Sequence, residues 1–212
     1  MAVHRFLWLS VLFAVSSPWL QAVTIWNNGS PDNLDGHAMT DFLQADDFSV
    51  GLLSNLTAIR FWNLEASPSD FSGSIFWAIY TDLGSAPGVA LLSGTAVPTR
   101  TANGAALGFN EFQNDFNITV SGLVSGTYWL VLHNGDPITN TAFTDYYWAT
   151  SAAGTGNGQQ KSLSPPDLNW SSNSSEHAFV IFGDAVVVPE PGAFLLVGAG
   201  LGLLLHLRYR RV

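Results

Sequence analysis

The feature that most limits the fold of this chain is a series of short runs of β-branched and aromatic residues. Clusters of Gly, Pro, Asn, Asp and Ser separate these runs, which is the pattern of strands joined by turns. The expected strands cover residues 57–62, 74–80, 89–92, 116–120, 127–133 and 177–182. No window has the 3.6-residue periodicity of a convincing amphipathic helix. We therefore expect an all-β protein.

The run 74–80 is apolar on both faces, because alternate residues of a strand point to opposite sides. A strand of this kind is covered on both sides, as in packed sheets. Trp77 and Trp129 lie within such runs and are expected in the core. Many short strands separated by turns favour one β-sandwich, which we expect over residues 23–187.

Residues 1–22 have the three parts of a secretory signal peptide. Arg5 supplies the positive charge, residues 6–15 are mainly apolar, and Ala22 is a small residue suited to cleavage. A helix of ten residues is about 15 Å long, half of a bilayer core of about 30 Å. We expect this segment to be removed during export. The alternative is an uncleaved anchor helix.

The C-terminal segment, residues 188–212, starts with Pro189, Glu190 and Pro191. The two prolines disfavour helix, so this linker is expected to be extended. Residues 193–207 follow as a short apolar stretch, which predicts a transmembrane helix slightly below the usual length.

A basic cluster ends the chain and is expected to stay on the cytoplasmic side as a stop signal. It consists of Arg208, Arg210 and Arg211. The body would then lie outside the membrane, joined to it by the proline linker.

In its three parts and their order, the segment 188–212 resembles the PEP-CTERM sorting signal. That resemblance implies processing by an exosortase, a membrane enzyme that cleaves near the motif and passes the protein to the cell surface. It also implies a Gram-negative bacterium that makes exopolysaccharide, with an inner-membrane intermediate before surface or extracellular display. Pro189, Glu190 and Pro191 would be recognition residues, not catalytic ones. The alternative is a permanent membrane anchor.

The body carries a second resemblance, over residues 46–183. The segments 45–48, 61–62, 126–132 and 147–148 resemble a jelly-roll-like domain of many exported bacterial proteins of unassigned function. The resemblance implies a jelly-roll-like β-sandwich and brings no known active site with it.

Charge and cysteine content exclude several functions. The chain has 16 acidic and 7 basic residues, and between Val23 and Val188 there are 15 acidic and 3 basic ones. Such a body would repel a phosphate backbone, so nucleic-acid binding is excluded. The absence of cysteine excludes disulfides, thiolate zinc sites and cysteine nucleophiles.

No nucleophile-elbow, zinc-protease or phosphate-loop motif occurs in the sequence. His37 is expected in a loop, and His133 and His177 at strand ends, as surface or capping residues. Glycoside hydrolysis needs two carboxylates across a cleft, and the sequence places no such pair. We therefore expect no enzymatic activity.

Calcium is the one cofactor that the sequence suggests. Asp32, Asn33 and Asp35 supply oxygen ligands on an expected turn. Asp47, the fourth candidate ligand, follows Asp46 just before an expected strand. Their spacing does not match the twelve-residue calcium loop. The alternative is that Asp and Asn cap their own backbone in Asx turns.

Two tryptophans are candidates for stacking on sugar rings. Trp170 lies in a polar loop, and Trp148 lies beside Tyr146 and Tyr147. The alternative is that both are hydrophobic plugs beneath loops.

Three functions remain open. The first is a non-enzymatic surface protein of the exopolysaccharide or biofilm matrix, sorted by its tail. The second is a carbohydrate-binding module on the same scaffold, and the third is a surface polysaccharide hydrolase.

Overall fold

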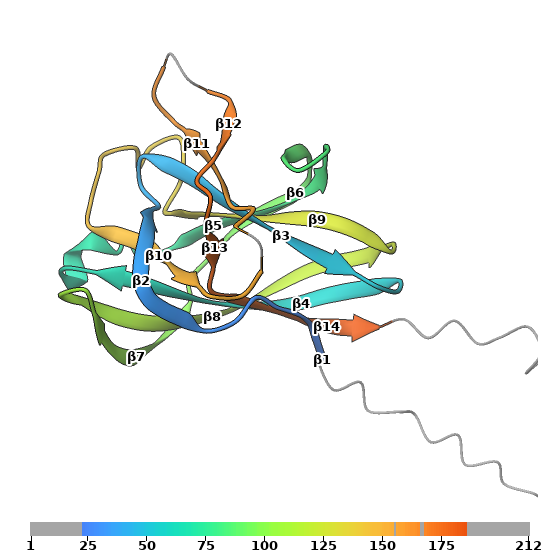
Figure 1. Ribbon diagram of the computed structural model, residues 1–212, viewed down its shortest axis with the longest axis horizontal. Coiled ribbons are helices and arrows are strands. Elements are labelled where there is room, and N and C mark those ends of the chain that lie inside the picture. The colour runs from blue at the N-terminus through green and yellow to red at the C-terminus, as the bar shows by residue number, and fades with distance from the viewer. Residues whose placement is uncertain (1–22, 155, 166–167, 186–212) are drawn as a thin grey trace, which may run out of the picture.

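The computed structural model describes residues 23–154, 156–165 and 168–185 (Figure 1). These residues form fourteen strands and one short 3-10 helix, η1 (Pro68–Asp70), and the described part of the chain has no α-helix. The expectation of an all-β protein is confirmed. The expected signal peptide (1–22) and sorting signal (188–212) lie outside the described residues. None of the described residues forms a helix long and apolar enough to cross a membrane.

The strands are divided between two sheets. The larger sheet contains β1 (Val23–Asn27), β2 (Pro31–Ala38), β4 (Ser54–Glu65), β7 (Thr99–Ala106), β8 (Phe109–Leu123), β10 (Tyr146–Ser151), β13 (Glu176–His177) and β14 (Phe179–Ala185). The smaller sheet contains β3 (Phe42–Val50), β5 (Ile75–Asp82), β6 (Pro87–Ala96), β9 (Gly126–Asn134), β11 (Gln159–Ser162) and β12 (Trp170–Ser172).

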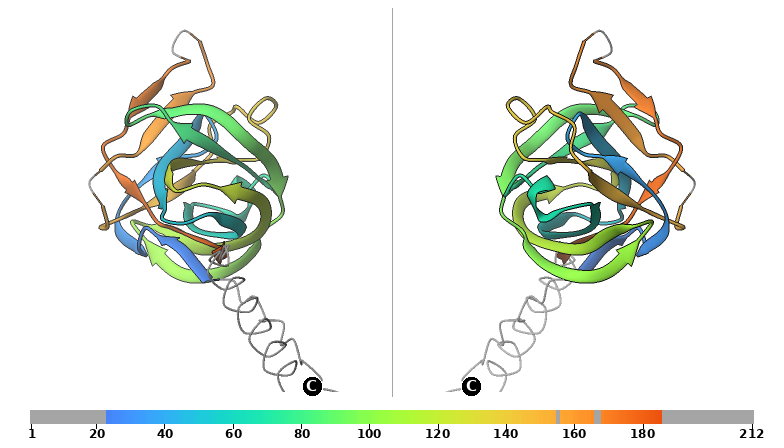
Figure 2. Two further views of the ribbon diagram at one scale, coloured as in Figure 1. Left: turned by 90° about the vertical axis from the view of Figure 1, so that its right-hand side faces the viewer. Right: turned by 90° about the vertical axis from the view of Figure 1, so that its left-hand side faces the viewer.

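The strand order shows that the chain passes repeatedly from one sheet to the other. The smaller sheet has the order β12-β11-β3-β9-β5-β6, and the larger has β1-β14-β4-β10-β13, with β8 pairing β4 and β7, and β2 pairing β10. All these strand pairs are antiparallel. In the end-on views of Figure 2 the two sheets enclose one interior, consistent with a β-sandwich.

Large apolar side chains from both sheets fill this interior. Phe48 and Leu130 come from the smaller sheet, and Phe61, Trp148 and Phe179 from the larger. Burying one such side chain stabilises the fold by about 1.5–3 kcal/mol, so this shared core holds the sheets together.

Four of the six strands expected from sequence lie within observed strands. The expected strand 74–80 begins one residue before β5, and 177–182 covers the end of β13 and the first part of β14. Trp77 and Trp129 are buried, as expected. The polar strand β2 was expected as a turn, and that expectation is wrong. Its backbone pairs with β10, and a left-handed residue, Asn33 (φ 62°), lies within the strand.

One ion pair is buried at an end of the sandwich. Arg100 of β7 reaches the fully buried carboxylate of Glu65 in β4. The guanidinium carbon lies 4.4 Å from the ring centre of Phe71 and 4.3 Å from that of Phe112, so two aromatic faces also hold the cation. Removing Arg100 would leave the carboxylate of Glu65 buried without a cation.

We predict that Arg100→Met lowers the free energy of unfolding by about 3–5 kcal/mol, because one charge of a buried pair is left uncompensated. The matched control is Arg60→Met, since Arg60 pairs with Asp115 at 2.7 Å while both side chains are about one-third exposed. A partly exposed pair of this kind contributes at most about 1 kcal/mol to the free energy of unfolding. Urea unfolding of both variants measures the difference, and equal losses would contradict the prediction.

Candidate metal centre

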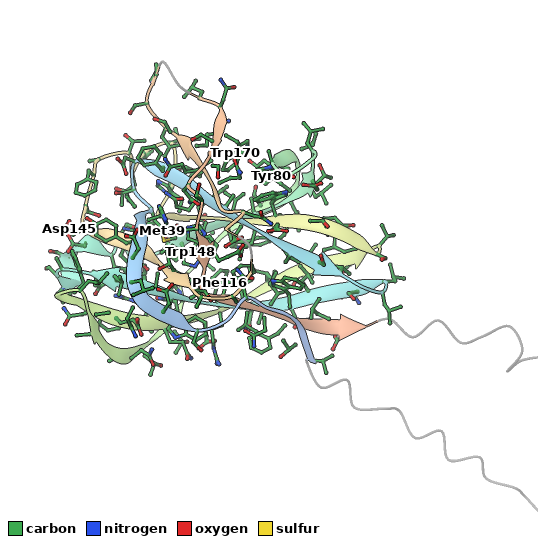
Figure 3. The ribbon with its side chains drawn as sticks, viewed as in Figure 1. Met39, Tyr80, Phe116, Asp145, Trp148 and Trp170 are labelled. Carbon is green, nitrogen blue, oxygen red and sulfur yellow. The ribbon has the colours of Figure 1, made fainter. Side chains whose placement is uncertain are left out.

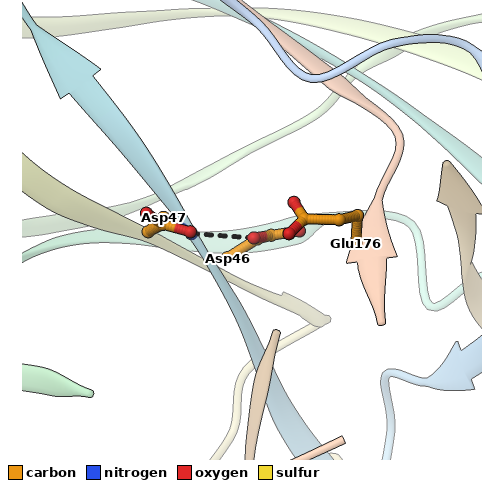
Figure 4. A group of neighbouring side chains, drawn as sticks. All are labelled: Asp46, Asp47 and Glu176. Atoms are coloured by element: carbon orange, nitrogen blue, oxygen red, sulfur yellow. Dashed lines mark hydrogen bonds between the residues drawn. The ribbon is translucent and has the colours of Figure 1, made fainter. Parts of the chain in front are cut away.

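Three carboxylates converge where the two sheets meet (Figure 4). Asp46 and Asp47 are neighbours in β3 of the smaller sheet, and Glu176 lies in β13 of the larger sheet. One carboxylate oxygen from each residue lies within 4.8 Å of the others. Folding brings Glu176 to the two aspartates across about 130 residues of sequence. We call these three residues the carboxylate triad.

The triad is largely shielded from water. Asp46 is 0% exposed, Glu176 is 6% exposed, and Asp47 is half-buried. Burial raises the pKa of Asp46 well above its usual value, and the neighbouring negative charge of Glu176 raises it further. The same two causes raise the pKa of Asp47. The ionised triad is therefore costly unless a positive charge compensates it.

The three basic residues of the body make other contacts in the described part of the chain. Arg60 pairs with Asp115 and Arg100 with Glu65. The ammonium of Lys161 lies 6.0 Å from the ring centre of Trp170.

Backbone groups supply part of the compensation. Asp46 Oδ1 accepts a hydrogen bond from the amide of Asp47 at 2.8 Å, and Asp46 Oδ2 accepts one from the amide of His177 at 2.5 Å. Glu176 Oε1 accepts from the amides of Gly156 and Asn157, at 2.7 and 3.0 Å. These dipoles orient the carboxylates but carry no net charge.

The loop that supplies the last two amides wraps closely around Glu176. Gly154 has φ +78°, and a Cβ at this position would collide with the Glu176 carboxylate. Glycine is therefore required here both for the backbone conformation and for the close approach.

Three oxygen atoms surround the side-chain nitrogen of the buried residue Asn28. Its Nδ2 lies 2.8 Å from Glu176 Oε2, 3.0 Å from the carbonyl oxygen of His177 and 3.3 Å from Asp46 Oδ2. An amide nitrogen has only two hydrogens for these three acceptors. Rotating the amide by 180° would present its Oδ1 to the same point, so the residue suits either a hydrogen bond donor or a cation ligand.

His177 borders the triad but does not neutralise it. Its Nδ1 lies 3.1 Å from Asp46 Oδ2, and its ring packs against Trp148 with the centroids 4.5 Å apart. Burial lowers the pKa of His177 to about 3, against a smaller opposing effect of Glu176. The ring is therefore uncharged at neutral pH.

His133 and His177 lie at strand ends, as expected, but the expected surroundings of these two residues and the expected loop position of His37 are wrong. His133 and His177 are fully buried, not surface or capping residues, because packing between the sheets covers both. His37 lies in β2, not in a loop, and its ring contacts that of His177 with the centroids 5.2 Å apart.

A pocket of about 300 Å³ opens next to the triad. Glu176 forms part of its wall, together with Asp32, Asp35, Thr150 and Ser151. Its lining is mainly small and polar, and no aromatic residue belongs to it. The triad therefore lies between the protein interior and a polar opening.

The structure separates the residues that the sequence suggested for calcium. Of the four, only Asp47 belongs to the triad. Asp32 Oδ1 accepts hydrogen bonds from the amide of Leu34 and the hydroxyl of Thr150, and Asp35 Oδ1 accepts one from the next amide in the chain. Asp32 and Asp35 thus act as local caps, and Asn33 adopts the left-handed backbone conformation.

One triad member, Glu176, was missed from the sequence. Asp46 was noted beside Asp47, but the pair was expected just before a strand and lies within β3. Glu176 carried no local signal, because only the pairing of β13 with β10 brings it to the triad.

The two candidate sugar-stacking tryptophans have different environments (Figure 3). Trp148 is 0% exposed in the sandwich interior, and its indole nitrogen donates to the carbonyl of Ala178 at 3.0 Å. It cannot stack on an external sugar, which corrects that expectation. Trp170 is half-buried on β12 and meets Tyr80 edge-to-face, with the ring centres 5.9 Å apart.

No protein-family model, curated protein or solved structure matches this chain.

We predict that acid destabilises the protein through His37. Burial and the adjacent His177 lower the pKa of His37 to about 4, below the 6.5 of an unperturbed histidine. As the pH falls below 6.5 the unfolded chain therefore takes up a proton that the folded protein does not. This one group lowers the free energy of unfolding by up to about 1.4 kcal/mol for each pH unit.

His37→Asn and His37→Gln should remove this contribution, so that stability falls less steeply between pH 7 and 5 than in the wild-type protein. Asp46 and Asp47 have raised pKa values and act in the opposite direction in all three proteins, so the difference between the proteins isolates His37. The measurement is urea unfolding at several pH values. Parallel pH dependences for the three proteins would refute the prediction.

Proposed function

We propose that this chain is an exported, non-enzymatic surface protein whose jelly-roll-like domain binds calcium at the carboxylate triad. The observation that carries the proposal is the triad itself, in which one carboxylate oxygen of each residue lies within 4.8 Å of the others and both Asp46 and Glu176 are buried. A bound divalent cation would compensate these converging negative charges.

The donor set fits calcium. Calcium takes six to eight oxygen ligands from carboxylates, amide oxygens, backbone carbonyls and water. The triad offers three carboxylates, and Asn28 and the carbonyl of His177 lie at the same point. Magnesium demands a near-ideal octahedron and keeps several waters, which a largely buried site does not favour. Sulfur ligands for zinc are absent, because the chain has no cysteine.

Protons and calcium would compete for the same oxygens. Burial and the charge of Glu176 raise the pKa of Asp46, so protons compete for this carboxylate more readily than for an exposed one. Calcium binds the ionised form, so the affinity for calcium should fall as the pH is lowered.

The burial of the triad also supports a non-enzymatic role. A glycoside hydrolase presents two carboxylates to the sugar on opposite sides of a cleft. Here Asp46 is fully buried and Glu176 nearly so, and their side chains are held by backbone amides. A polysaccharide chain would not reach both.

We predict that millimolar calcium raises the melting temperature of the purified protein by about 5–10 °C over a chelator. At a hundredfold excess over Kd, binding to the native state adds about 2.7 kcal/mol of stability, and 1 kcal/mol corresponds to about 2–4 °C for a domain of this size. Scanning calorimetry is the measurement.

Magnesium is the control ion, because general screening of the negative charge would act equally with either ion. Asp47→Asn should remove most of the calcium shift, since Asp47 is half-buried and lies in the triad. Asp32→Asn is the matched control and should keep the shift, because Asp32 caps β2 and lies outside the triad. A shift below one degree, or one that magnesium reproduces, would exclude a specific calcium site.

Sorting to the cell surface rests on the terminal segments. The signal-peptide pattern of residues 1–22 and the PEP-CTERM-like pattern of residues 188–212 support export and exosortase processing. A surface protein of this kind would belong to the exopolysaccharide or biofilm matrix of a Gram-negative bacterium.

We predict that protein extracted from the cell surface ends near Glu190 and lacks residues 193–212. Intact-mass analysis measures this end, and material that retains Arg211 would show a permanent anchor. Replacing Pro189 and Pro191 with Ala should block processing, because helix could then extend into a segment that the protease must bind extended.

Carbohydrate binding is the second candidate function. The observation that favours it is Trp170, which is half-exposed beside Tyr80 and Lys161 on the smaller sheet. Saturable binding of the purified protein on a glycan array, lost in Trp170→Ala with an unchanged melting temperature, would support this function. Absence of binding to any glycan would contradict a carbohydrate-binding function.

A further inference from the structure

We propose that β6 is a self-association edge, at which two copies of this chain pair antiparallel and join their smaller sheets. The proposal is independent of calcium and of the triad. It rests on the position of β6 in the sheet, its exposed apolar side chains and its lack of charge.

The first observation is that β6 has a free edge. Among the described strands it ends the smaller sheet and pairs only with β5. With ten residues, it is longer than β1, β12 and β13, which end the other described strand orders. Such a strand is about 33 Å long and presents unpaired backbone donors and acceptors along one side.

The second observation is that apolar side chains gather at this edge. Val89 is 71% exposed, Leu91 47% and Leu92 42%. Leu83 and Val97, which flank the strand, are also exposed. Contiguous exposed apolar residues on a soluble domain mark an interaction site more often than scattered ones do.

The third observation identifies the partner as a second copy. Residues 83–99 contain no ionisable side chain, although residues 23–188 carry 15 acidic and 3 basic residues. Two such acidic bodies repel each other over most of their surfaces. The neutral segment lets them approach without placing like charges face to face. Asp82, the carboxylate next to it, already accepts hydrogen bonds from the amides of Gly84 and Ser85 and from the indole nitrogen of Trp129.

Symmetry fits the same partner. An antiparallel pair of identical strands is self-complementary, which is what a two-fold interface requires. Pro87 begins the strand, and Leu91 has no partner on β5 because the register shifts beside Tyr80. These two irregularities limit indiscriminate strand addition, so pairing should centre on residues 92–96.

The absence of cysteine makes the test direct. In the full-length chain, single cysteines replace Leu92, Ser93 or Thr95, and Val124→Cys in the β8–β9 turn is the matched exposed control. After mild oxidation, at least one β6 position should form a covalent dimer with at least tenfold the yield of Val124→Cys. A disulfide needs Cα atoms within about 7 Å, so only positions near the two-fold axis should link.

Adding Leu92→Lys to a linking variant at Ser93 or Thr95 should abolish the dimer without changing the melting temperature, because Leu92 is 42% exposed and lies in the pairing segment. Raising the salt concentration from 0.05 to 0.3 M should increase the yield, since salt screens the repulsion between the acidic bodies. A β6 yield equal to that of Val124→Cys would overturn the proposal. A yield that falls with salt would do so too, because it would show a contact driven by opposite charges.

Discussion

Burying carboxylates in a chain with very few cations is the constraint on which the polar part of this structure depends. The body has only three basic residues, and two of them, Arg60 and Arg100, are already paired with Asp115 and Glu65. Glu65 and the carboxylate triad differ in the groups that compensate their negative charge. Glu65 meets a guanidinium held between two aromatic rings, whereas Asp46 and Glu176 meet backbone amides and Asn28.

The location of the triad connects this electrostatic problem to the fold. Asp46 belongs to the smaller sheet and Glu176 to the larger, so a cation at this point would tie the two sheets together. His177, Trp148 and Phe179 connect the same corner to the apolar core. The triad therefore lies both between the two sheets and beside the polar pocket. A domain that binds calcium would have a higher free energy of unfolding in calcium-rich surroundings outside the cell than where the ion is scarce.

Particular residues show how far the sequence predicts this architecture. The strand around Trp77 is apolar on both faces, and a pattern of that kind is local, so it identifies a covered strand without knowledge of its neighbours. Strand β2 is polar and contains a left-handed residue, and its extended form depends on pairing with β10, which no local pattern records. Trp148 follows two tyrosines in an apparently exposed segment, yet it lies inside the sandwich because β10 is a central strand of the larger sheet.

The sequence by itself determined the all-β class, six strand positions, the scarcity of cations and the presence of the acidic pair Asp46 and Asp47. These properties follow from composition and from patterns within a few residues. Only the tertiary structure decided that Glu176 joins that pair, that Asp32 and Asp35 act as local caps, and that His133 and His177 are buried. The physical reason is that sheet pairing between distant segments sets which side chains meet, and the energy of a buried charge depends on those neighbours more than on its place in the chain.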